Sequence, residues 1–173
     1  PVAGARYAAL EGSDLAIVTD AGGTTYDVSL VRGGAIPRTR ETWIGPLYQG
    51  HMTGFPSVDV KSIGAGGGSI ASVDAAGLLS VGPESAGSSP GPVCYGRGGT
   101  EPTVTDAALV LGHIDPAYFL GGDMSLALEA TRAAIEEKIA RPLGVGVEEA
   151  ALAIVDLATE QMVAAIEAIT IRQ

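Results

Sequence analysis

The stretch Ile17–Val31, IVTDAGGTTYDVSLV, constrains the fold most, because it predicts two apolar strands joined by an acidic turn. The turn offers the carboxylate of Asp20, the bare backbone of Gly22–Gly23 and the hydroxyls of Thr24–Thr25, and Asp27 follows. Backbone N–H groups of a glycine turn can approach a phosphate closely, because no Cβ stands in the way. By itself the turn fits either a phosphate-binding loop or a hairpin that simply uses small residues.

Composition narrows the class of protein. The 173 residues, 46% of them hydrophobic, can bury a core, and no run of ~18 apolar residues suggests a membrane span. The net charge of −10 argues against nucleic acid, which needs clustered Lys and Arg. The single cysteine, Cys94, cannot form an internal disulfide and fits a reducing, cytoplasmic compartment. Because the chain starts at Pro1 and its last residues continue a helical pattern, we expect a fragment of a longer protein.

Strand patterns dominate residues 1–92. We expect a three-stranded antiparallel meander, turning at Gly33–Gly34, from Leu15–Asp20, Tyr26–Arg32 and Ala35–Trp43. After the irregular stretch Gly45–Pro56, further strands are expected at Val58–Ile63, Ser69–Asp74 and Leu78–Val81, the last two as a hairpin. The long Gly- and Pro-rich loop Gly82–Pro102 is expected to pack back on the body through Val93–Tyr95.

Residues 103–173 are expected to be mainly helical. The predicted helices are Thr103–Gly112, Ser125–Ala140 and one that begins near Val147. Thr103 and Ser125 are the expected caps of the first two. The fold class is therefore α/β (α+β at the level of the segment), in a single lobe.

Several strings occur together and in order: DAGGTTYDVSLV, SIGAGGGSIASVD, GLLSVGPESAGSSPGPVCYGRGGTEPTVTDAALVLG and PAYFLGG. They closely resemble the hydantoinase A/oxoprolinase family, which also includes ATP-dependent ketone carboxylase subunits related to acetone and acetophenone carboxylases. The resemblance implies one lobe of a fold similar to actin, sugar kinases and heat-shock chaperones (ribonuclease H-like). In that fold two lobes each contribute an acidic glycine-rich hairpin to the phosphates of ATP.

By this resemblance, Asp20 would help to hold Mg²⁺ and would be catalytic together with Asp27, and Gly22, Gly23, Thr24 and Thr25 would contact phosphate. The chemistry implied is activation of an amide or ketone oxygen by phosphoryl transfer from ATP, which depends on positioning and charge neutralisation. The family's N-terminal hairpin and its adenosine-binding stretch are absent from these residues. We therefore expect about half of an ATP site, and no ATP hydrolysis by the segment alone.

The glycine run Gly64–Ser69 matches neither a Walker A loop nor a dinucleotide fingerprint. One interpretation is that its backbone amides contact a phosphate or the substrate, above all those of Gly66, Gly67 and Gly68. The other is that the glycines permit close packing. Both interpretations stay open at this stage.

Other polar residues have simpler explanations. Asp106 suits the first turn of a helix, with a role in the site as the alternative. Asp59 and Asp74 are expected to be solvated, with one of them a possible site residue. His51 could meet substrate or metal but has no partner at ligand spacing, and His113 follows a helix end. Ser85 lacks the spacing of a nucleophile elbow, and Cys94 is expected to be a buried, inert thiol.

The favoured function is the nucleotide-binding lobe of an ATP-dependent cyclic-amide hydrolase that works with a hydantoinase B-type partner subunit. The alternatives are a subunit of an ATP-dependent ketone carboxylase and a non-catalytic nucleotide-binding or assembly lobe.

Overall fold

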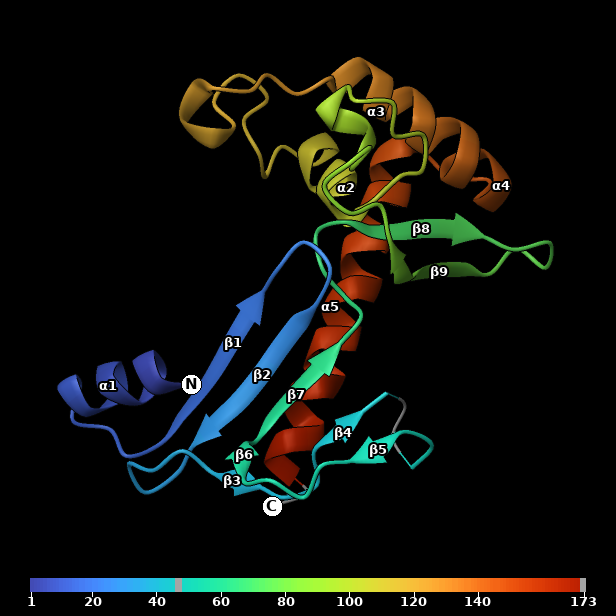
Figure 1. Ribbon diagram of the computed structural model, residues 1–173. Helices are drawn as coiled ribbons and strands as arrows, with labels where there is room; N and C mark the ends of the chain where they lie inside the picture. Colours follow the sequence, from blue (N-terminus) through green and yellow to red (C-terminus); the bar gives the residue numbers. More distant parts are fainter. Residues whose placement is uncertain (46–47, 172–173) are drawn as a thin grey trace. The chain divides into compact units, whose positions relative to one another are not determined.

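The structure is a computed structural model that describes residues 1–45 and 48–171 (Figure 1). Helices and strands are mixed along the chain. The described residues form two compact units. Unit 1 comprises Pro1–Asp20, Asp27–Ser62 and the residues from Ala165 onward, and unit 2 comprises Ala21–Tyr26 and Ile63–Ala164. The single lobe expected from the sequence stays a prediction, and the two units are described separately.

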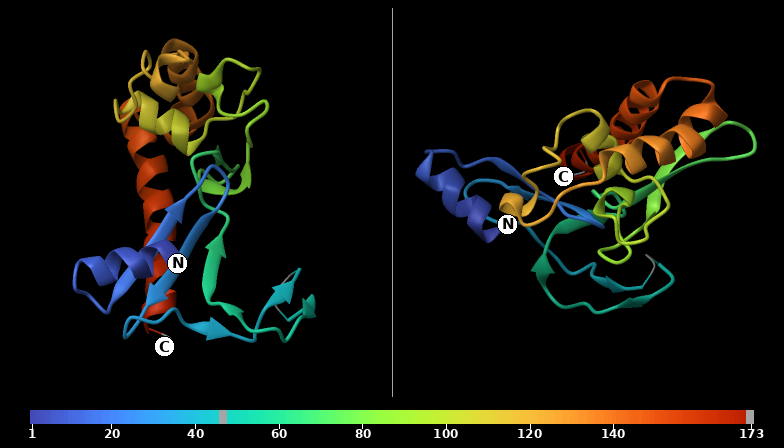
Figure 2. Two further views of the ribbon diagram at one scale, coloured as in Figure 1. Left: turned by 60° about the vertical axis from the view of Figure 1, so that its left-hand side comes forward. Right: turned by 90° about the horizontal axis from the view of Figure 1, so that it is seen from above.

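Unit 1 is built on a three-stranded sheet in which β2 is the central strand. The strand order is β1 (Ala16–Ala21), β2 (Tyr26–Val31) and β7 (Val60–Ile63). In Figures 1 and 2 the arrows of β1 and β2 run in opposite directions, as a hairpin requires. Val28 and Val31 of β2 are buried, whereas β1 is largely exposed, and α1 (Val2–Leu10) precedes it. The first two predicted strands are therefore confirmed.

The predicted third strand, Ala35–Trp43, is wrong. The turn at Gly33–Gly34 does form, with φ of 58° and 69° and a bridge between Arg32 and Ala35. Pro37 then follows, and a proline has no N–H with which to continue a ladder. The chain instead forms two short antiparallel pairs, β3 (Arg38–Thr39) with β6 (Ser57–Val58) and β4 (Trp43–Ile44) with β5 (His51–Met52). The stretch expected to be irregular, Gly45–Pro56, therefore contains β5, and residues 46–47 within it lie outside the described residues.

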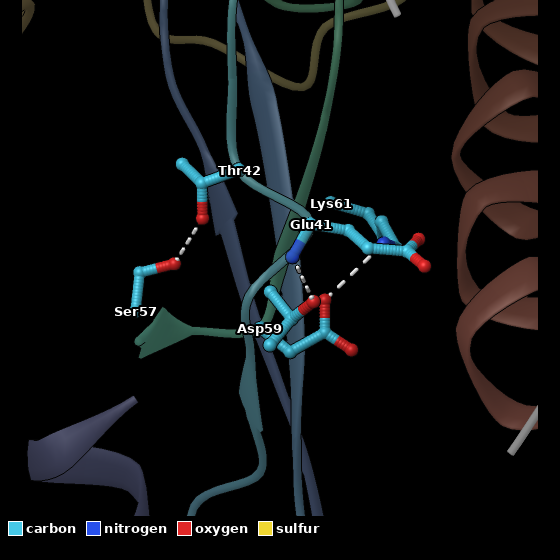
Figure 3. A network of polar contacts seen from close by, with 6 residues as sticks. Glu41, Thr42, Ser57, Asp59 and Lys61 are labelled. Atoms are coloured by element: carbon cyan, nitrogen blue, oxygen red, sulfur yellow. Dashed lines mark hydrogen bonds and ion pairs between the residues drawn. The ribbon is translucent and has the colours of Figure 1, made fainter. Parts of the chain in front are cut away.

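Polar contacts form beside these short strands (Figure 3). Thr42 Oγ1 lies 2.6 Å from Ser57 Oγ, and Lys61 Nζ lies 3.2 Å from Asp59 Oδ1. The expectation that Asp59 is solvated is wrong, since only 7% of the residue is exposed. Its ion pair and its N–H bond to the carbonyl oxygen of Pro37 tie it into the unit.

Unit 2 packs a β-hairpin against helices around an apolar core, and a second buried cluster of Cys94, Leu109 and Leu126 lies in the same unit. The hairpin is β8 (Ser69–Val73) with β9 (Leu79–Ser85), as predicted, although β9 extends beyond Val81. The helices are α2 (Val104–Val110), α3 (Leu128–Ile135), a π-helical turn (Glu136–Ala140), α4 (Arg141–Leu143) and α5 (Val147–Ile171, of which the part to Ala164 lies in this unit), with 3₁₀ turns at Val93–Tyr95 and Leu120–Gly122. The buried core comprises Ala71, Val81, Ala107, Ile135, Ile139, Ala140, Ala150, Ala151, Ile154 and Ala158.

The helix predictions are partly confirmed. Thr103 caps α2 in a capping box, and α5 starts at the predicted position. The second helix begins three residues after the predicted cap, Ser125, because the intervening amides have partners elsewhere. Leu126 N–H donates to Pro116 and Ala127 N–H donates to Cys94. None of the described helices is long and apolar enough to cross a membrane.

Candidate functional site

The β1–β2 turn, Ala21–Thr25, belongs to unit 2, and every one of its residues is exposed. The turn is closed by Gly22 N–H, which donates to the carbonyl oxygen of Thr25 at 2.9 Å. Among the described residues, none accepts a hydrogen bond from the N–H groups of Gly23 and Thr24. Two exposed amides and two exposed hydroxyls therefore lie within one short turn, and these are donors that an anion can use.

The glycine run packs directly beneath this turn. Gly67 N–H donates to Gly22 O at 3.0 Å, and Gly68 N–H donates to Gly23 O at 2.7 Å. A Cβ on Gly66 would lie 2.6 Å from Gly22 O, and one on Gly68 would lie 2.8 Å from Gly23 O. These glycines are thus required by close approach of two backbones, whatever else they do.

The N–H groups of Gly66, Gly67 and Gly68 all donate within the protein, that of Gly66 to Ser69 Oγ at 2.9 Å. This arrangement agrees with the interpretation that the glycine run permits close packing. Direct phosphate contact by these three amides stays a prediction.

Two hydroxyl residues that the sequence analysis did not assign to the turn lie against this arrangement. Thr105, in the first turn of α2, donates both its N–H (2.7 Å) and its Oγ1 (2.8 Å) to the carbonyl oxygen of Gly67. At the end of β9, the half-buried Ser85 has its Oγ 3.4 Å from Thr24 Oγ1. Neither is signalled by a sequence motif, because the partner of each lies tens of residues away.

Asp106 fixes the long loop to the start of α2. Its carboxylate is fully buried and accepts from the N–H groups of Val93 (3.1 Å), Cys94 (2.8 Å) and Thr103 (2.9 Å), and from Thr103 Oγ1 (2.8 Å). Such a carboxylate needs bonded donors to be stable out of water. Asp106 is therefore a structural anchor, as the helix-start interpretation anticipated. Its bonds to the loop go beyond that interpretation.

The loop after β9 packs back on the body, as predicted. Val93 and Cys94 are buried, and the Tyr95 ring lies 5.8 Å from that of Phe119. Burial, together with the neighbouring Asp106 charge, raises the pKa of the Cys94 thiol far above its usual value. A protonated thiol is a poor nucleophile, so the expectation of an inert Cys94 agrees with its surroundings.

The two candidate carboxylates belong to unit 1. Both line a cavity of 320 Å³ whose other lining residues are Pro1, Val18, Thr19, Ser29 and Val60. Asp20 is exposed, and Asp27 is half-buried and accepts a hydrogen bond from Ser62 Oγ. The described residues contain no group of three or more His, Cys, Asp or Glu that could hold a metal ion. An ion beside Asp20 would therefore rely on few protein ligands, a condition that suits hydrated Mg²⁺ better than Zn²⁺.

The two histidines and Asp74 are all exposed. His51 is exposed in β5, and His113 is exposed after α2. Asp74 is exposed and caps the β8–β9 turn by accepting from Ala76 and Leu78. A separate, largely apolar cavity of 550 Å³ in unit 2 is lined by residues of β9 and α5, among them Val81, Leu157 and Gln161.

Similarity to known proteins extends over the whole chain. The sequence matches the family described as Hydantoinase/oxoprolinase over residues 1–173. It is 44% identical over 173 residues to caprolactamase subunit alpha of Pseudomonas jessenii, covering 100% of this chain and 24% of that protein. It is 46% identical over 172 residues to the acetophenone carboxylase gamma subunit of Aromatoleum aromaticum, covering 96% of this chain and 23% of that protein.

A solved structure gives the same result. The crystal structure of the ATP-dependent caprolactamase from Pseudomonas jessenii matches with a TM-score of 0.87 at 45% identity, over 98% of this chain and 24% of that one. The chain thus spans about a quarter of the length of these relatives. With a family match from the first residue to the last, the chain belongs to the hydantoinase/oxoprolinase family.

Proposed function

We propose that this chain is part of the nucleotide-binding lobe of an ATP-dependent hydrolase of cyclic amides, with a fold similar to the actin and sugar kinase superfamily. The observation that carries the proposal is the exposed turn Ala21–Thr25, held by backbone bonds from Gly67 and Gly68. Its free amides and hydroxyls suit a phosphate, and its main-chain support makes the donors rigid before a ligand arrives.

The relatives support the same reaction class. One is named an ATP-dependent caprolactamase, and caprolactam is a cyclic amide. Opening an unstrained amide ring is difficult in water, and transfer of the γ-phosphoryl group of ATP to the amide oxygen would make the carbonyl carbon more electrophilic. Water would then add to that carbon and the ring C–N bond would break, with a proton going to the nitrogen. A second water would release phosphate from the acyl phosphate that remains. In this proposal Gly23, Thr24 and Thr25 bind phosphate oxygens, and Asp20 and Asp27 are the catalytic carboxylates.

Mg²⁺ is part of the proposal. Asp20 can offer carboxylate oxygens to a cation, and few acidic residues lie near it. This suits a cation that keeps most of its waters. When bound, Mg²⁺ would neutralise phosphate charge. Asp20 would hold its hydration shell.

The intact enzyme tests the proposal. We expect Asp20→Ala to abolish ATP turnover with a lactam or 5-oxoproline as substrate. Asp74→Ala is the control, because it removes a carboxylate from an exposed hairpin turn and should leave ATP turnover unchanged. If ATP turnover survives in Asp20→Ala, the catalytic role of Asp20 fails and a non-catalytic assembly lobe becomes the better interpretation.

A ketone carboxylase subunit is the second candidate, favoured by the 46% identity to the acetophenone carboxylase gamma subunit. Product analysis separates the two. The hydrolase forms an amino acid from a lactam or from oxoproline with ATP, whereas the carboxylase consumes ketone and bicarbonate. Both relatives are named as subunits, so we further propose a second, hydantoinase B-type subunit as partner, which copurification with the intact protein would test.

A further inference from the structure

Peptide groups beneath the turn form two continuous hydrogen-bonded chains. The C=O of Gly67 and the N–H of Gly68 belong to one peptide group. This group accepts from Thr105 at its oxygen and donates to Gly23 O at 2.7 Å. The C=O of Gly23 and the N–H of Thr24 belong to the next peptide group. The first chain therefore runs from Thr105 to the exposed N–H of Thr24.

The second chain runs in parallel. Ala86 N–H donates to Gly68 O (2.9 Å), Ser69 N–H donates to Gly66 O (3.0 Å), and Gly67 N–H donates to Gly22 O (3.0 Å). Its last peptide group ends in the N–H of Gly23. Both chains thus end at the two amides for which the described residues offer no acceptor.

Hydrogen bonds in series polarise one another, because a peptide group that accepts at its oxygen becomes a stronger donor at its nitrogen. The first chain starts with two donors on one oxygen, the N–H and the Oγ1 of Thr105. The bond that follows, from Gly68 to Gly23, is 2.7 Å long, at the short end of the N–H···O range. The polarisation is directed toward Thr24 N–H, where it favours negative charge.

We propose that Thr105 is a positioning residue that raises the affinity of the β1–β2 turn for phosphate, acting through Gly67, Gly68 and Gly23. The inference rests on the proposed function, since it concerns the same phosphate. Thr105 does not touch the phosphate. It fixes the peptide group that supports the turn and strengthens the outward amide.

The test is a graded series at position 105 in the intact enzyme, with ATP and adenosine as probes in isothermal titration. Thr105→Val keeps the shape of the side chain and removes its hydroxyl donor. Because only the polarisation passed along the chain, about 10–30% of a bond, reaches the phosphate, ATP should bind about 1.5- to 3-fold more weakly. Thr105→Ser restores the donor and should bind ATP as the wild type does. Adenosine carries no phosphate, so its affinity should be the same in all variants.

The matched control is Thr159→Val, which removes an exposed hydroxyl that donates to Val155 O within α5. It should not change ATP binding. If Thr105→Val does not fold, Thr105→Cys decides, since a thiol is a weaker donor of similar size and should give a smaller loss.

The possible failures are distinguishable. A wild type that binds no ATP, or an Asp20→Ala variant with full turnover, overturns the proposed function. A wild type that binds ATP, with Thr105→Val (or Thr105→Cys) equal to Thr105→Ser, overturns only the role of Thr105. Equal loss of ATP and adenosine in Thr105→Val also overturns it, because that result would indicate general damage.

Discussion

Replacing Asp106 by asparagine should release the loop that follows β9. The carboxylate accepts one bond at Oδ1, from Cys94 N–H, and three at Oδ2, from Val93 N–H and from the N–H and Oγ1 of Thr103. Asparagine has one side-chain oxygen and one NH₂ group. In the more favourable of its two orientations, the oxygen takes the place of Oδ2 and keeps the three bonds from Val93 and Thr103, and the NH₂ group faces Cys94 N–H. At least one charge-assisted bond is lost, and two donors then face each other in a buried site.

The size of the effect follows from that geometry. A hydrogen bond to a charged group contributes about 1.5–3 kcal/mol, and an unsatisfied buried donor adds to the loss. We expect the loop to open more easily by about 2–4 kcal/mol. At about 1.4 kcal/mol per factor of ten, the amides of Val93 and Cys94 should exchange about 30- to 700-fold faster.

Hydrogen exchange followed by mass spectrometry on peptides that cover residues 86–103 of the intact protein measures this change. The matched control is Asp74→Asn, in which the exposed side chain can keep its single accepting oxygen toward Ala76 and Leu78. Its hairpin should exchange as before. Less than about a threefold change in Asp106→Asn would refute the idea that this carboxylate anchors the loop.

Three further changes test other parts of unit 2. Gly66→Ala places a Cβ 2.6 Å from a main-chain oxygen of the turn and should cost about 1–3 kcal/mol in thermal unfolding. A melt like that of Gly146→Ala, where a Cβ meets nothing within 4 Å, would contradict this reasoning. Because burial raises the pKa of its thiol, Cys94 should resist iodoacetamide at about pH 8 until denaturant is added. Mass spectrometry measures the labelling. Rapid labelling of the native protein would contradict a buried, inert thiol. The hydrogen bond from Lys138 lowers the pKa of Glu101. The contribution of this contact to the free energy of unfolding is therefore present above the ordinary pKa of 4.5 and is lost as pH falls through the lowered pKa. Lys138→Met should therefore destabilise the protein by less than about 1 kcal/mol at neutral pH and by almost nothing near pH 3. Urea titrations at the two pH values measure this difference. An equal loss of stability at the two pH values would disprove the role of the ion pair.

Local patterns in the sequence predicted most of the individual elements. The alternation around Asp20–Thr25 gave the first hairpin, and Thr103 with Asp106 gave the start of α2. The spacing of Ala151, Ile154 and their successors gave α5. Each of these signals lies within a few residues of the structure it specifies, because helix caps, turns and periodic burial are local effects.

Errors arose where distant partners decide. The expected third strand failed because Pro37 cannot donate to a ladder, and β7 pairs with β2 instead. Asp59 is buried beside Lys61, and Ser125 does not cap α3 because nearby amides bond to Pro116 and Cys94. No local pattern contains these partners.

The sequence by itself determined that Ala21–Thr25 is a turn between two strands, and its strings identified the family. Only the tertiary structure decided which groups inside the protein Gly66, Gly67 and Gly68 contact, because a glycine has no side chain to reveal its neighbour. The amides of Gly67 and Gly68 donate to the turn, that of Gly66 donates to Ser69 Oγ, and Thr105 donates to the carbonyl oxygen of Gly67 from a helix far along the chain. Backbone hydrogen bonds between distant segments depend on how the chain packs, so their direction becomes known only when the fold is known.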